Sequence, residues 1–446
     1  MMNSDTVYAL SSGIGKAGIA VVRLSGSLAR DVVVGMAGTL PMPRRASLRV
    51  IRNPKSAEIV DQGMVLWFPG PNSATGEDMA EFHLHGSSAA VAGVFDAFST
   101  YKGVRPAEAG EFTRRAFANG CIDLVEAEGL ADLLNARSSR QRQQALHHVM
   151  GEASSVYEEW RGRLLRVLAR VEAAVDFVDE DGVAETALAD VSIGIVDLAK
   201  NMSEALAQAE RANAVREGIK IVLAGAPNTG KSSLLNALAR REAAIVSPIP
   251  GTTRDVIEVA MEIEGMAVIL TDTAGLRGET TDEIERMGIA RSRQELRQAD
   301  IVVWVSSPDI AGSAAVAEGV HASAMVVNKC DLLTKESGLL RNESPGTIEV
   351  SSRSGEGIAD VIARLGELIR GKYGQTEGAV VVRNRQRQAI AESIRHLNDS
   401  LGHGARQLEV MAEDLRKAAH ALGRVTGRID VEDLLAAIFS EFCIGK

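Results

Sequence analysis

Four short runs of residues, in order between positions 225 and 331, have the types and spacing of a guanine-nucleotide site. They are Gly225-Ala-Pro-Asn-Thr-Gly-Lys-Ser232, Gly251-Thr-Thr-Arg-Asp255, Asp272-Thr-Ala-Gly275 and Asn328-Lys-Cys-Asp331. Each run has a separate physical role, so ordinary turns do not explain their ordered occurrence. Together the runs predict a protein that binds a guanine nucleoside triphosphate.

The first run predicts a phosphate-binding loop. It follows the apolar run Ile219–Leu223 and opens a helix near Ser232, which is the context that a P-loop requires. Its glycines let backbone N–H groups wrap phosphate oxygens, and the helix N-terminus adds positive potential. We expect Lys231 to reach the β- and γ-phosphates and Ser232 to bind Mg²⁺. The nucleotide contacts expected here are Asn228, Thr229, Gly230, Lys231, Ser232 and Ser233.

The second and third runs offer groups for the metal ion and the γ-phosphate. Asp272 is the expected carboxylate near Mg²⁺, and Gly275 can offer its N–H group to the γ-phosphate. Thr253 is the candidate second Mg²⁺ hydroxyl and sensor of the γ-phosphate. The nucleotide contacts expected from these segments are Ser247, Pro248, Ile249, Pro250, Gly251, Thr252, Thr253, Asp272, Thr273, Ala274 and Gly275.

The fourth run predicts which base is bound. Asp331 can accept both N–H donors on the Watson–Crick edge of guanine, which adenine lacks, so an ATPase is disfavoured. Asn328 and Lys329 are expected to brace the loop, with the lysine stem covering the base, while Cys330 is expected to be a packing residue. A further loop can cap the guanine carbonyl through backbone N–H groups. It consists of Ser351, Ser352 and Arg353.

The residue after the third run bears on hydrolysis. Many small GTPases place a glutamine there to orient water, but this chain has Leu276, which cannot do so. A monovalent cation, held by the side-chain carbonyl of Asn228 and backbone carbonyls of residues 247–252, would replace the charge of an arginine. This hypothesis predicts hydrolysis that K⁺ stimulates and Na⁺ does not. Glu285 is a candidate to orient water through a second water, and a solvated carboxylate on a helix face is the alternative.

Several domains must carry these residues, because the chain has 446 residues and one core rarely grows past about 250–300. Between residues 216 and 373, short runs rich in valine and isoleucine alternate with helical segments, which favours a mostly parallel sheet covered on both faces. The polar–apolar alternation of Val256–Ile263 predicts one antiparallel edge hairpin. The buried strands are expected at Ile219–Leu223, Val268–Leu270, Ile301–Val305, Met325–Val327 and Ile348–Val350.

The flanking segments have different patterns. Residues 1–119 are glycine-rich, with strands expected at Gly18–Leu24 and Met64–Phe68. Residues 120–215 and 374–446 have apolar residues at helical spacing, with a break at Glu180-Asp-Gly182. The simplest interpretation is a P-loop α/β domain, residues 216–373, inserted into a helical domain.

Composition narrows the class of protein further. Hydrophobic residues make up 46% and charged residues 24%, as in ordinary globular proteins. No apolar run reaches about 18 residues, so we expect no membrane span, and the first residues lack the pattern of a signal peptide. Three distant cysteines argue against a disulfide framework and favour a cytoplasmic protein. A net charge of −10 weakens non-specific nucleic-acid binding but allows a local basic groove.

The chain resembles one family along essentially its whole length, the bacterial and organellar tRNA-modification GTPases (MnmE, also called TrmE). The nucleotide-binding runs are shared with other GTPases. The runs Phe68-Pro-Gly-Pro-Asn-Ser73 and Cys443-Ile-Gly-Lys446 are far more specific to the family. Other matching runs are Thr75-Gly-Glu-Asp78, Gly110-Glu-Phe112 and Arg115-Ala-Phe117.

The resemblance implies an α+β folate-binding domain (residues 1–119) that also forms a homodimer, a helical domain in two segments (120–215 and 374–446) and an inserted GTPase domain (216–373). It also implies a heterotetrameric complex with an FAD-dependent partner. That complex installs a carboxymethylaminomethyl-type group at C5 of the tRNA wobble uridine. The implied one-carbon donor is a reduced folate, either 5-formyl- or 5,10-methylene-tetrahydrofolate.

The resemblance also implies roles for particular residues. Glu285 matches the catalytic switch glutamate of the family. Cys443 matches a terminal cysteine that is either a nucleophile toward uridine C6 or an anchor for Lys446. Cys121 stands where relatives usually have a basic folate contact, so that contact is absent or made differently. The implied ligand contacts are Ser232 and Thr253 for Mg²⁺, Asn228, Ser247, Ile249 and Thr252 for K⁺, and Arg23, Glu81 and Lys446 for folate.

Three alternatives remain open from the sequence. His83 and His85 alternate on one strand face as metal ligands can, but a structural role is favoured because no third ligand is evident. Arg383, Arg385 and Arg387 either contact tRNA phosphates or form a solvated helix face. The rival function is an Era-like GTPase switch in ribosome or RNA assembly. Such proteins usually carry an RNA-binding module, of which the segment after residue 374 shows no sign.

Overall fold

The computed structural model describes residues 5–176, 183–241, 258–272, 294–313, 315–316, 319–333, 346–374, 378–403, 407–429, 435, 438–439, 442 and 444–445. The chain divides into two compact units. The first consists of Met1–Ala131, His148–Leu198 and Glu392–Lys446, and the second of Asp132–His147 and Ala199–Ala391.

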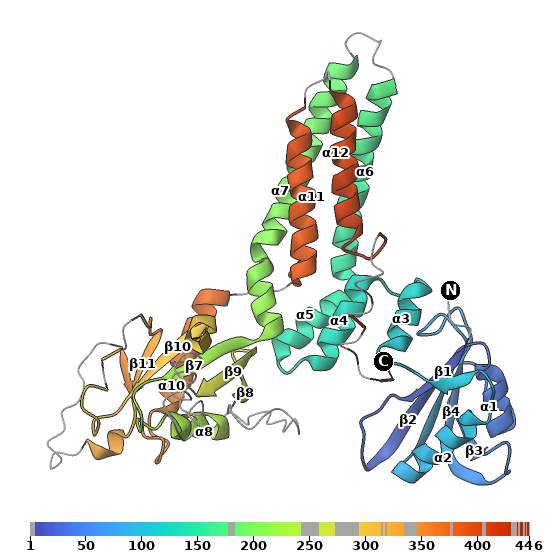
Figure 1. The fold of residues 1–446 in the computed structure, drawn as a ribbon, viewed down its shortest axis with the longest axis horizontal. Coiled ribbons are helices and arrows are strands. Elements are labelled where there is room, and N and C mark those ends of the chain that lie inside the picture. Colours follow the sequence, from blue (N-terminus) through green and yellow to red (C-terminus); the bar gives the residue numbers. More distant parts are fainter. Residues whose placement is uncertain are drawn as a thin grey trace, which may run out of the picture. The chain divides into compact units, whose positions relative to one another are not determined.

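The N-terminal part of the first unit is an α+β domain on a six-stranded sheet (Figure 1). The strand order is β3-β4-β5-β2-β1-β6, with β1 and β6 parallel and the other neighbours antiparallel. The expected strands Gly18–Leu24 and Met64–Phe68 lie within β2 and β4. The elements are β1 (Thr6–Leu10), β2 (Ala17–Ser25), α1 (Ala29–Ala37), β3 (Ser47–Arg52), β4 (Ile59–Phe68), β5 (Met79–Gly86), α2 (Ser88–Ser99), β6 (Val104–Pro106) and α3 (Glu111–Ala118).

One face of this sheet is buried under α1 and α2. Val22, Val65 and Phe82 point from β2, β4 and β5 into a core that these two helices close. Because successive strand residues point to opposite faces, Arg23 on β2 and Glu81 on β5 lie on the other face.

Helix α3 is fixed to the β4–β5 loop by a buried ion network. Glu111 is only 1% exposed, and its carboxylate pairs with Arg105 and Arg115 at 2.8 Å each. Arg115 also pairs with Glu77 of the loop at 3.0 Å. Burial alone would raise the pKa of Glu111, but hydrogen bonds from Arg105, the Glu108 backbone and Arg115 lower that pKa to about 2. The runs Thr75–Asp78 and Arg115–Phe117 therefore meet in space.

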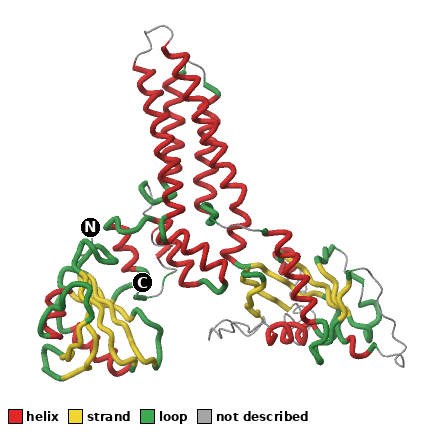
Figure 2. The backbone as a smooth tube through the Cα atoms, turned by 180° about the vertical axis from the view of Figure 1, so that it is seen from behind, coloured by secondary structure: helices red, strands yellow, loops and turns green. Residues whose placement is uncertain are grey.

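The segments outside the two sheet domains are largely helical, as the 3–4 spacing predicts. In the first unit α6 packs along α12, and Arg416 pairs with Glu172 across them at 2.9 Å (Figures 1 and 2). The expected break at Glu180–Gly182 lies outside the described residues. No helix in the described ranges is long and apolar enough to cross a membrane. The helices are α4 (Leu124–Asn135), α5 (Ser139–Val149), α6 (Glu152–Asp176), α7 (Val183–Glu217), α11 (Asn384–Leu401) and α12 (Leu408–Gly423).

The second unit is built on a sheet of order β12-β11-β10-β7-β9-β8. Every neighbouring pair is parallel except β8–β9, the hairpin at the edge. The predicted mostly parallel sheet with one antiparallel edge strand is therefore confirmed. The elements are β7 (Ile219–Ala224), α8 (Lys231–Arg241), β8 (Glu258–Ile263), β9 (Met266–Asp272), β10 (Ile301–Ser306), β11 (Ala324–Val327), a 3₁₀ turn (Cys330–Leu332), β12 (Thr347–Glu349) and α10 (Ile358–Tyr373).

Both faces of this sheet are covered, which explains its continuous apolar runs. Leu223 and Val303 face one core, which Leu234 of α8 and Leu365 of α10 complete. Ala224, Val302 and Trp304 face a second core on the other side.

The first turn of α5 holds the edge hairpin of this sheet. The Ser139 hydroxyl donates to the Glu262 carboxylate at 2.8 Å, and the Arg140 backbone N–H donates to the Gly265 carbonyl at 3.1 Å. Gly265 has φ 77°, and a Cβ there would lie 3.0 Å from the Ser139 hydroxyl. Ser139, Arg140 and Gln141 are called the α5 clasp below.

The α5 clasp also contacts the two points where the chain enters and leaves the sheet domain. The Gln141 side chain donates to the Arg216 carbonyl at 2.9 Å, just before Gly218 and β7. The Arg140 guanidinium donates to the carbonyl of Gly374, which ends α10, at 2.8 Å. One helical turn therefore contacts the chain where it enters the sheet domain, where it leaves that domain, and at the edge hairpin.

Candidate guanine-nucleotide site

The phosphate loop, Gly225–Ser232, connects β7 to α8. Gly225 and Gly230 have φ of 149° and 86°, and Asn228 between them has φ 62°. A Cβ on Gly225 would lie 2.1 Å from the Val305 carbonyl oxygen, and one on Gly230 would lie 2.3 Å from the side-chain nitrogen of Asn328. Backbone conformation and close approach therefore both require glycine at these two positions.

Lys231 points back into the curve of this loop. It is 4% exposed, and its ammonium donates to the carbonyls of Gly225 at 3.0 Å and Ala226 at 2.8 Å. The hydroxyl of buried Thr229 also donates to Ala226, at 2.9 Å. A buried ammonium requires acceptors, so the two carbonyls hold this charge at the N-terminus of α8, whose backbone N–H groups favour an anion.

Ser232 and Asp272 are brought together across the sheet. The Ser232 hydroxyl donates to a carboxylate oxygen of Asp272, which is fully buried at the carboxyl end of β9. One hydroxyl and one carboxylate form an all-oxygen donor set that suits Mg²⁺ shared with phosphates and water. The described parts of the chain contain no group of three or more His, Cys, Asp and Glu residues for a metal ion.

Asn328 joins the phosphate loop to the base-binding loops. Its side-chain NH₂ group donates to the carbonyls of Thr229 at 3.0 Å and Gly230 at 3.2 Å. Its side-chain oxygen accepts from the backbone N–H of Ser352 at 3.1 Å and from the Ser352 hydroxyl at 2.9 Å. Asn328 is 1% exposed, so this amide fixes three loops relative to one another.

Lys329 and Asp331 follow Asn328 at the carboxyl end of β11. Lys329 has φ 61°, and its ammonium pairs with Asp309 at 2.8 Å. Asp331 is exposed and lies in the 3₁₀ turn. Burial, together with the nearby charges of Glu356, Asp331 and Glu349, raises the pKa of the Cys330 thiol. A thiol held protonated is a packing residue rather than a nucleophile.

The loop after β12 has fewer N–H groups for a guanine carbonyl than the sequence suggests. The N–H of Ser351 donates to the Glu356 carbonyl at 3.0 Å, and that of Ser352 donates to Asn328. Of the three predicted donors, Arg353 is the one whose N–H has no acceptor among the residues that the structure describes, and its side chain is exposed.

The described nucleotide residues therefore meet at the carboxyl edge of β7, β9, β11 and β12, where open α/β sheets bind ligands. Ser233 is exposed at the start of α8. The other predicted positions lie outside the described residues. They are Ser247, Pro248, Ile249, Pro250, Gly251, Thr252, Thr253, Thr273, Ala274, Gly275 and Glu285.

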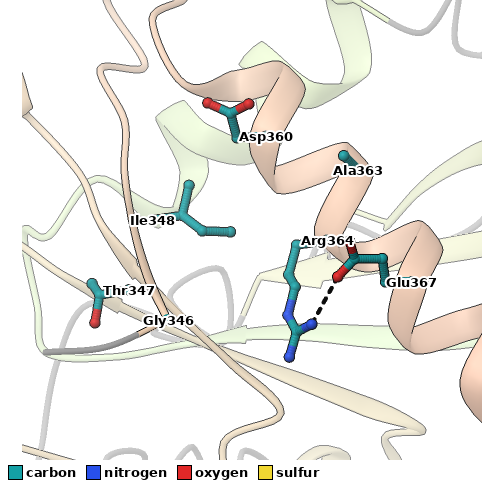
Figure 3. Close-up of a pocket in the computed structure, with 7 residues that line it drawn as sticks. All are labelled: Gly346, Thr347, Ile348, Asp360, Ala363, Arg364 and Glu367. Atoms are coloured by element: carbon teal, nitrogen blue, oxygen red, sulfur yellow. Dashed lines mark hydrogen bonds and ion pairs between the residues drawn. The ribbon is translucent and has the colours of Figure 1, made fainter.

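The cavity in Figure 3 lies apart from this edge. Its volume is about 400 Å³, and β12 and the exposed side of α10 line it. Its lining residues are Gly346, Thr347, Ile348, Asp360, Ala363, Arg364 and Glu367, none of which belongs to the nucleotide motifs.

A second polar cluster lies on the N-terminal sheet. Arg23 and Glu81 are directly opposite in the β2–β5 register, and their side chains pair at 3.0 Å. His83 approaches the same carboxylate at 3.2 Å, and the Arg23 guanidinium lies 5.8 Å from the centre of the Phe112 ring. Burial opposes ionisation of Glu81, but hydrogen bonds from His83 and Arg23 lower the pKa of its carboxyl. Sequence spacing gave no signal for His83 or Phe112 in this cluster, because strand register and α3 packing create it.

The C-terminal segment reaches this domain. Ile444 forms a β-bridge with Ala109, and the Ser11 hydroxyl donates to the Gly445 carbonyl at 2.9 Å. A Cβ on Gly445 would lie 2.3 Å from the Leu10 carbonyl oxygen, so the backbone of Gly445 packs closely against the end of β1. Cys443 and Lys446, which flank these two residues in the chain, lie outside the described residues, and Cys121 is exposed with a free thiol.

Side-chain contacts bear on the open alternatives for the two histidines of β5 and for the arginines at the start of α11. His85 pairs with Asp61 at 2.8 Å and His83 with Glu81, so each histidine already has a carboxylate partner, which supports a structural role. Arg383 is paired with Asp132 at 2.7 Å and is therefore neither a solvated side chain nor a free phosphate contact, whereas Arg387 is exposed.

The fold and site define a P-loop protein of the guanine-nucleotide-binding class, and comparison with known proteins gives its family. The family model "MnmE helical domain" matches residues 124–443, and the model "GTP-binding protein TrmE N-terminus" matches residues 6–121. The chain belongs to the MnmE family of tRNA modification GTPases.

Full-length relatives support this membership. The tRNA modification GTPase MnmE of a Methylobacterium species is 46% identical, covering 99% of this chain and 100% of the relative. That of Rhodopseudomonas palustris is 43% identical, covering 100% and 99%. A solved G domain of the T. maritima FeoB iron transporter is 25% identical over 34% of this chain and 98% of that chain, with a TM-score of 0.24.

Proposed function

We propose that this chain binds and hydrolyses GTP, and that the cycle serves modification of the tRNA wobble uridine at C5. The observation that carries the nucleotide part is the Asn328 amide, which joins the phosphate loop at Thr229 and Gly230 to the Ser352 loop. That arrangement supports Asp331 as the residue that reads the base, because Asn328, three residues before it, contacts the phosphate loop directly. Membership of the MnmE family supports the tRNA part.

Each nucleotide-site residue has a separate proposed role. Lys231 and the backbone amides of the loop hold the β- and γ-phosphates, and Ser232 and Asp272 hold Mg²⁺, with Thr253 as a second hydroxyl. Bound Mg²⁺ would supply charge that offsets the negative charge of the γ-phosphate and leaving group. Gly275 is the proposed N–H donor to the γ-phosphate, and Glu285 the proposed residue that orients water.

Base recognition gives the sharpest test. We expect Asp331→Asn to weaken GTP binding by about 10- to 100-fold and to favour XTP, because an amide donates to the xanthine 2-oxo group but cannot accept two N–H bonds. Isothermal titration calorimetry with GDP, XDP and ADP on the full chain measures this. Binding of adenine nucleotides by the wild-type protein as tightly as guanine nucleotides would refute the assignment.

We also propose that K⁺ takes the place of an arginine finger. Asn228 is exposed on the phosphate loop, and Ser247, Ile249 and Thr252 are its proposed fellow ligands. K⁺ is expected to stimulate hydrolysis at least about tenfold over Na⁺ at equal ionic strength, and Asn228→Ala to abolish the difference. Equal rates in KCl and NaCl would reject this part alone.

A reduced folate is the proposed ligand of the N-terminal domain. The cluster of Arg23, Glu81 and Phe112 supports it. An arginine suits a carboxylate of the folate glutamate tail, a glutamate suits the N–H groups of the pterin, and an aromatic side chain can pack against the pterin ring. The docking of Ile444 and Gly445 beside α3 supports Lys446 as a further contact and Cys443 as an anchor for it. Either 5-formyl- or 5,10-methylene-tetrahydrofolate is the proposed form.

The proposed assembly is a homodimer through the N-terminal domains, joined by an FAD-dependent partner into a heterotetramer in the cytoplasm. The proposed domains are residues 1–119, 120–215 with 374–446, and 216–373. An Era-like switch in RNA assembly is the alternative. Nucleoside analysis of tRNA from a deletion strain separates the two, because unmodified wobble uridine is expected only if the first function holds.

A further inference from the structure

The loop after β10 is a rigid platform beside the base-binding residues. Ser307 and Ser313 are both nearly fully buried. Ser313 closes the loop on itself, because its hydroxyl donates to the Ser307 carbonyl at 2.8 Å and accepts from the Ser307 N–H at 3.1 Å. The Trp304 indole N–H donates to the Ser313 carbonyl at 2.9 Å and ties the loop to β10. Such a closed network fixes whatever side chain the loop presents.

The side chain that this platform presents is Asp309. One carboxylate oxygen of Asp309 accepts from the Ser307 hydroxyl, and the other lies 2.8 Å from the Lys329 ammonium. The stem of Lys329 passes beside the phosphate loop, since a Cβ on Gly230 would lie 4.0 Å from its Cε atom. Both ends of the lysine are therefore fixed: its backbone by Asn328 beside it, and its ammonium by Asp309.

We propose that Asp309 is a positioning residue that holds the Lys329 stem as a wall against the purine ring. This inference rests on the proposed guanine site and adds a residue to it. No nucleotide motif contains Asp309, because it lies between β10 and β11, in a segment that the motif pattern leaves unassigned.

The charge of Asp309 has a second consequence for the base edge. Asp331 lies two residues after Lys329, and in the described part of the chain it has no ion-pair partner. An ammonium free to rotate would compete with guanine for the Asp331 carboxylate, since opposite charges a few ångströms apart attract. By holding the ammonium, Asp309 leaves Asp331 to accept the guanine N–H groups.

The test compares variants of the full-length protein. Asp309→Ala is expected to raise the Kd for GDP and for IDP by about five- to tenfold each, because the lysine stem covers the face of any purine. KM for GTP is expected to rise in parallel while kcat at saturation stays within about twofold. Asp309→Asn keeps an acceptor for the Ser307 hydroxyl and loses only the charge. It is expected to show the same rise in Kd and KM, with kcat again within about twofold.

A double-mutant cycle separates positioning from a merely structural role. In a Lys329→Ala background, Asp309→Ala is expected to change Kd by less than about twofold, because its target is gone. Glu367→Ala is the matched control. It breaks the Arg364–Glu367 pair, also 2.8 Å long, on α10, and is expected to leave Kd unchanged.

Unchanged Kd in both Asp309 variants, a fall in kcat with KM constant, or an undiminished effect in the Lys329→Ala background would each overturn the inference. Equal affinity of the wild-type protein for guanine and adenine nucleotides would instead refute the guanine site itself. The two failures are therefore distinguishable by the wild-type measurement.

Discussion

At the scale of single residues, buried polar side chains fix the positions of loops. Asn328 uses both ends of its side-chain amide, with bonds of 2.9–3.2 Å. The NH₂ group donates to Thr229 and Gly230, which are about 100 residues away in the sequence. The oxygen accepts from Ser352. Removing one partner of a buried bond leaves the other unsatisfied, which costs about 1–3 kcal/mol. These bonds therefore position the loops that we propose read the base and hold the phosphates relative to one another.

Glu111 gives a prediction at the same scale. Its pKa is lowered from 4.5 to about 2 in the folded protein, so the ionised form stabilises the fold above about pH 4.5, and this contribution is lost as the pH falls from 4.5 through 2. Glu111→Gln is expected to lower the free energy of unfolding by about 3 kcal/mol at pH 7, since one pKa unit corresponds to about 1.4 kcal/mol. Urea unfolding of the full chain at pH 7, 4 and 3 measures this.

Glu108→Gln is the control for Glu111→Gln. Its carboxylate is exposed and pairs with Arg114 at 3.3 Å, and exposed pairs contribute about 0–1 kcal/mol. A difference between wild type and Glu111→Gln that is as large at pH 3 as at pH 7 would contradict the proposed role of the ionised carboxylate.

At the scale of elements, the α5 clasp shows how a helix outside the sheet domain becomes part of it. Ser139, Arg140 and Gln141 make their bonds to the hairpin, to Gly374 and to Arg216. The sequence pattern predicts only a helix here, because helical spacing does not say which neighbours its first turn contacts. The hairpin strand β9 ends at Asp272, so the clasp contacts the hairpin that carries the carboxylate proposed for Mg²⁺.

Arg140→Ala is expected to loosen the β8–β9 hairpin. The Arg140 side chain covers the hairpin turn, since a Cβ on Gly265 would lie 3.2 Å from the Arg140 Cγ atom. Its bond to the Gly374 carbonyl, which holds the side chain there, is charge-assisted and partly buried and is worth about 1–2 kcal/mol. Hydrogen exchange of the amides in residues 258–272 is expected to become about 5- to 30-fold faster. Arg142→Ala, two residues along and exposed, is the control and is expected to leave exchange unchanged. Equal protection in both variants would show that the clasp does not stabilise the hairpin.

At the scale of the whole molecule, the open face of the N-terminal sheet bears on assembly. Leu48 is 58% exposed and Val50 is 37% exposed, and both lie on the face of β3 opposite Ile51 of the core. Exposed apolar side chains gathered on one sheet face are typical of an interaction surface. This supports the proposed homodimer through the N-terminal domains.

Leu48→Lys is expected to weaken that homodimer at least about tenfold, because burying an unpaired ammonium in an apolar interface costs more than about 1.4 kcal/mol. Sedimentation equilibrium over a range of protein concentrations measures the dimer constant. Val196→Lys also replaces an exposed apolar side chain by lysine, on α7, and is expected to leave the dimer dissociation constant unchanged. A dimer of wild-type strength in Leu48→Lys would place the interface elsewhere.

Residue types and their spacing are enough to define the class of the nucleotide domain. Glycines that allow positive φ, the alternation of apolar runs with helices, and Asp331 after a buried strand are local properties, readable from residue type and spacing. They predicted the parallel sheet with its antiparallel edge, and they placed the described motif residues at strand ends. The family-specific runs predicted the N-terminal and helical domains in the same way.

Which distant side chains meet depends on how whole elements pack in the folded chain. Arg23 and Glu81 were expected as separate ligand contacts, but strand register places them in one ion pair with His83. Arg383 was expected at a surface, but packing pairs it with Asp132. The physical reason is that register and helix packing depend on the summed burial of whole elements, which no short run of residues specifies. Pairing between segments is therefore fixed by the fold, while the chemistry of each segment is fixed by its sequence.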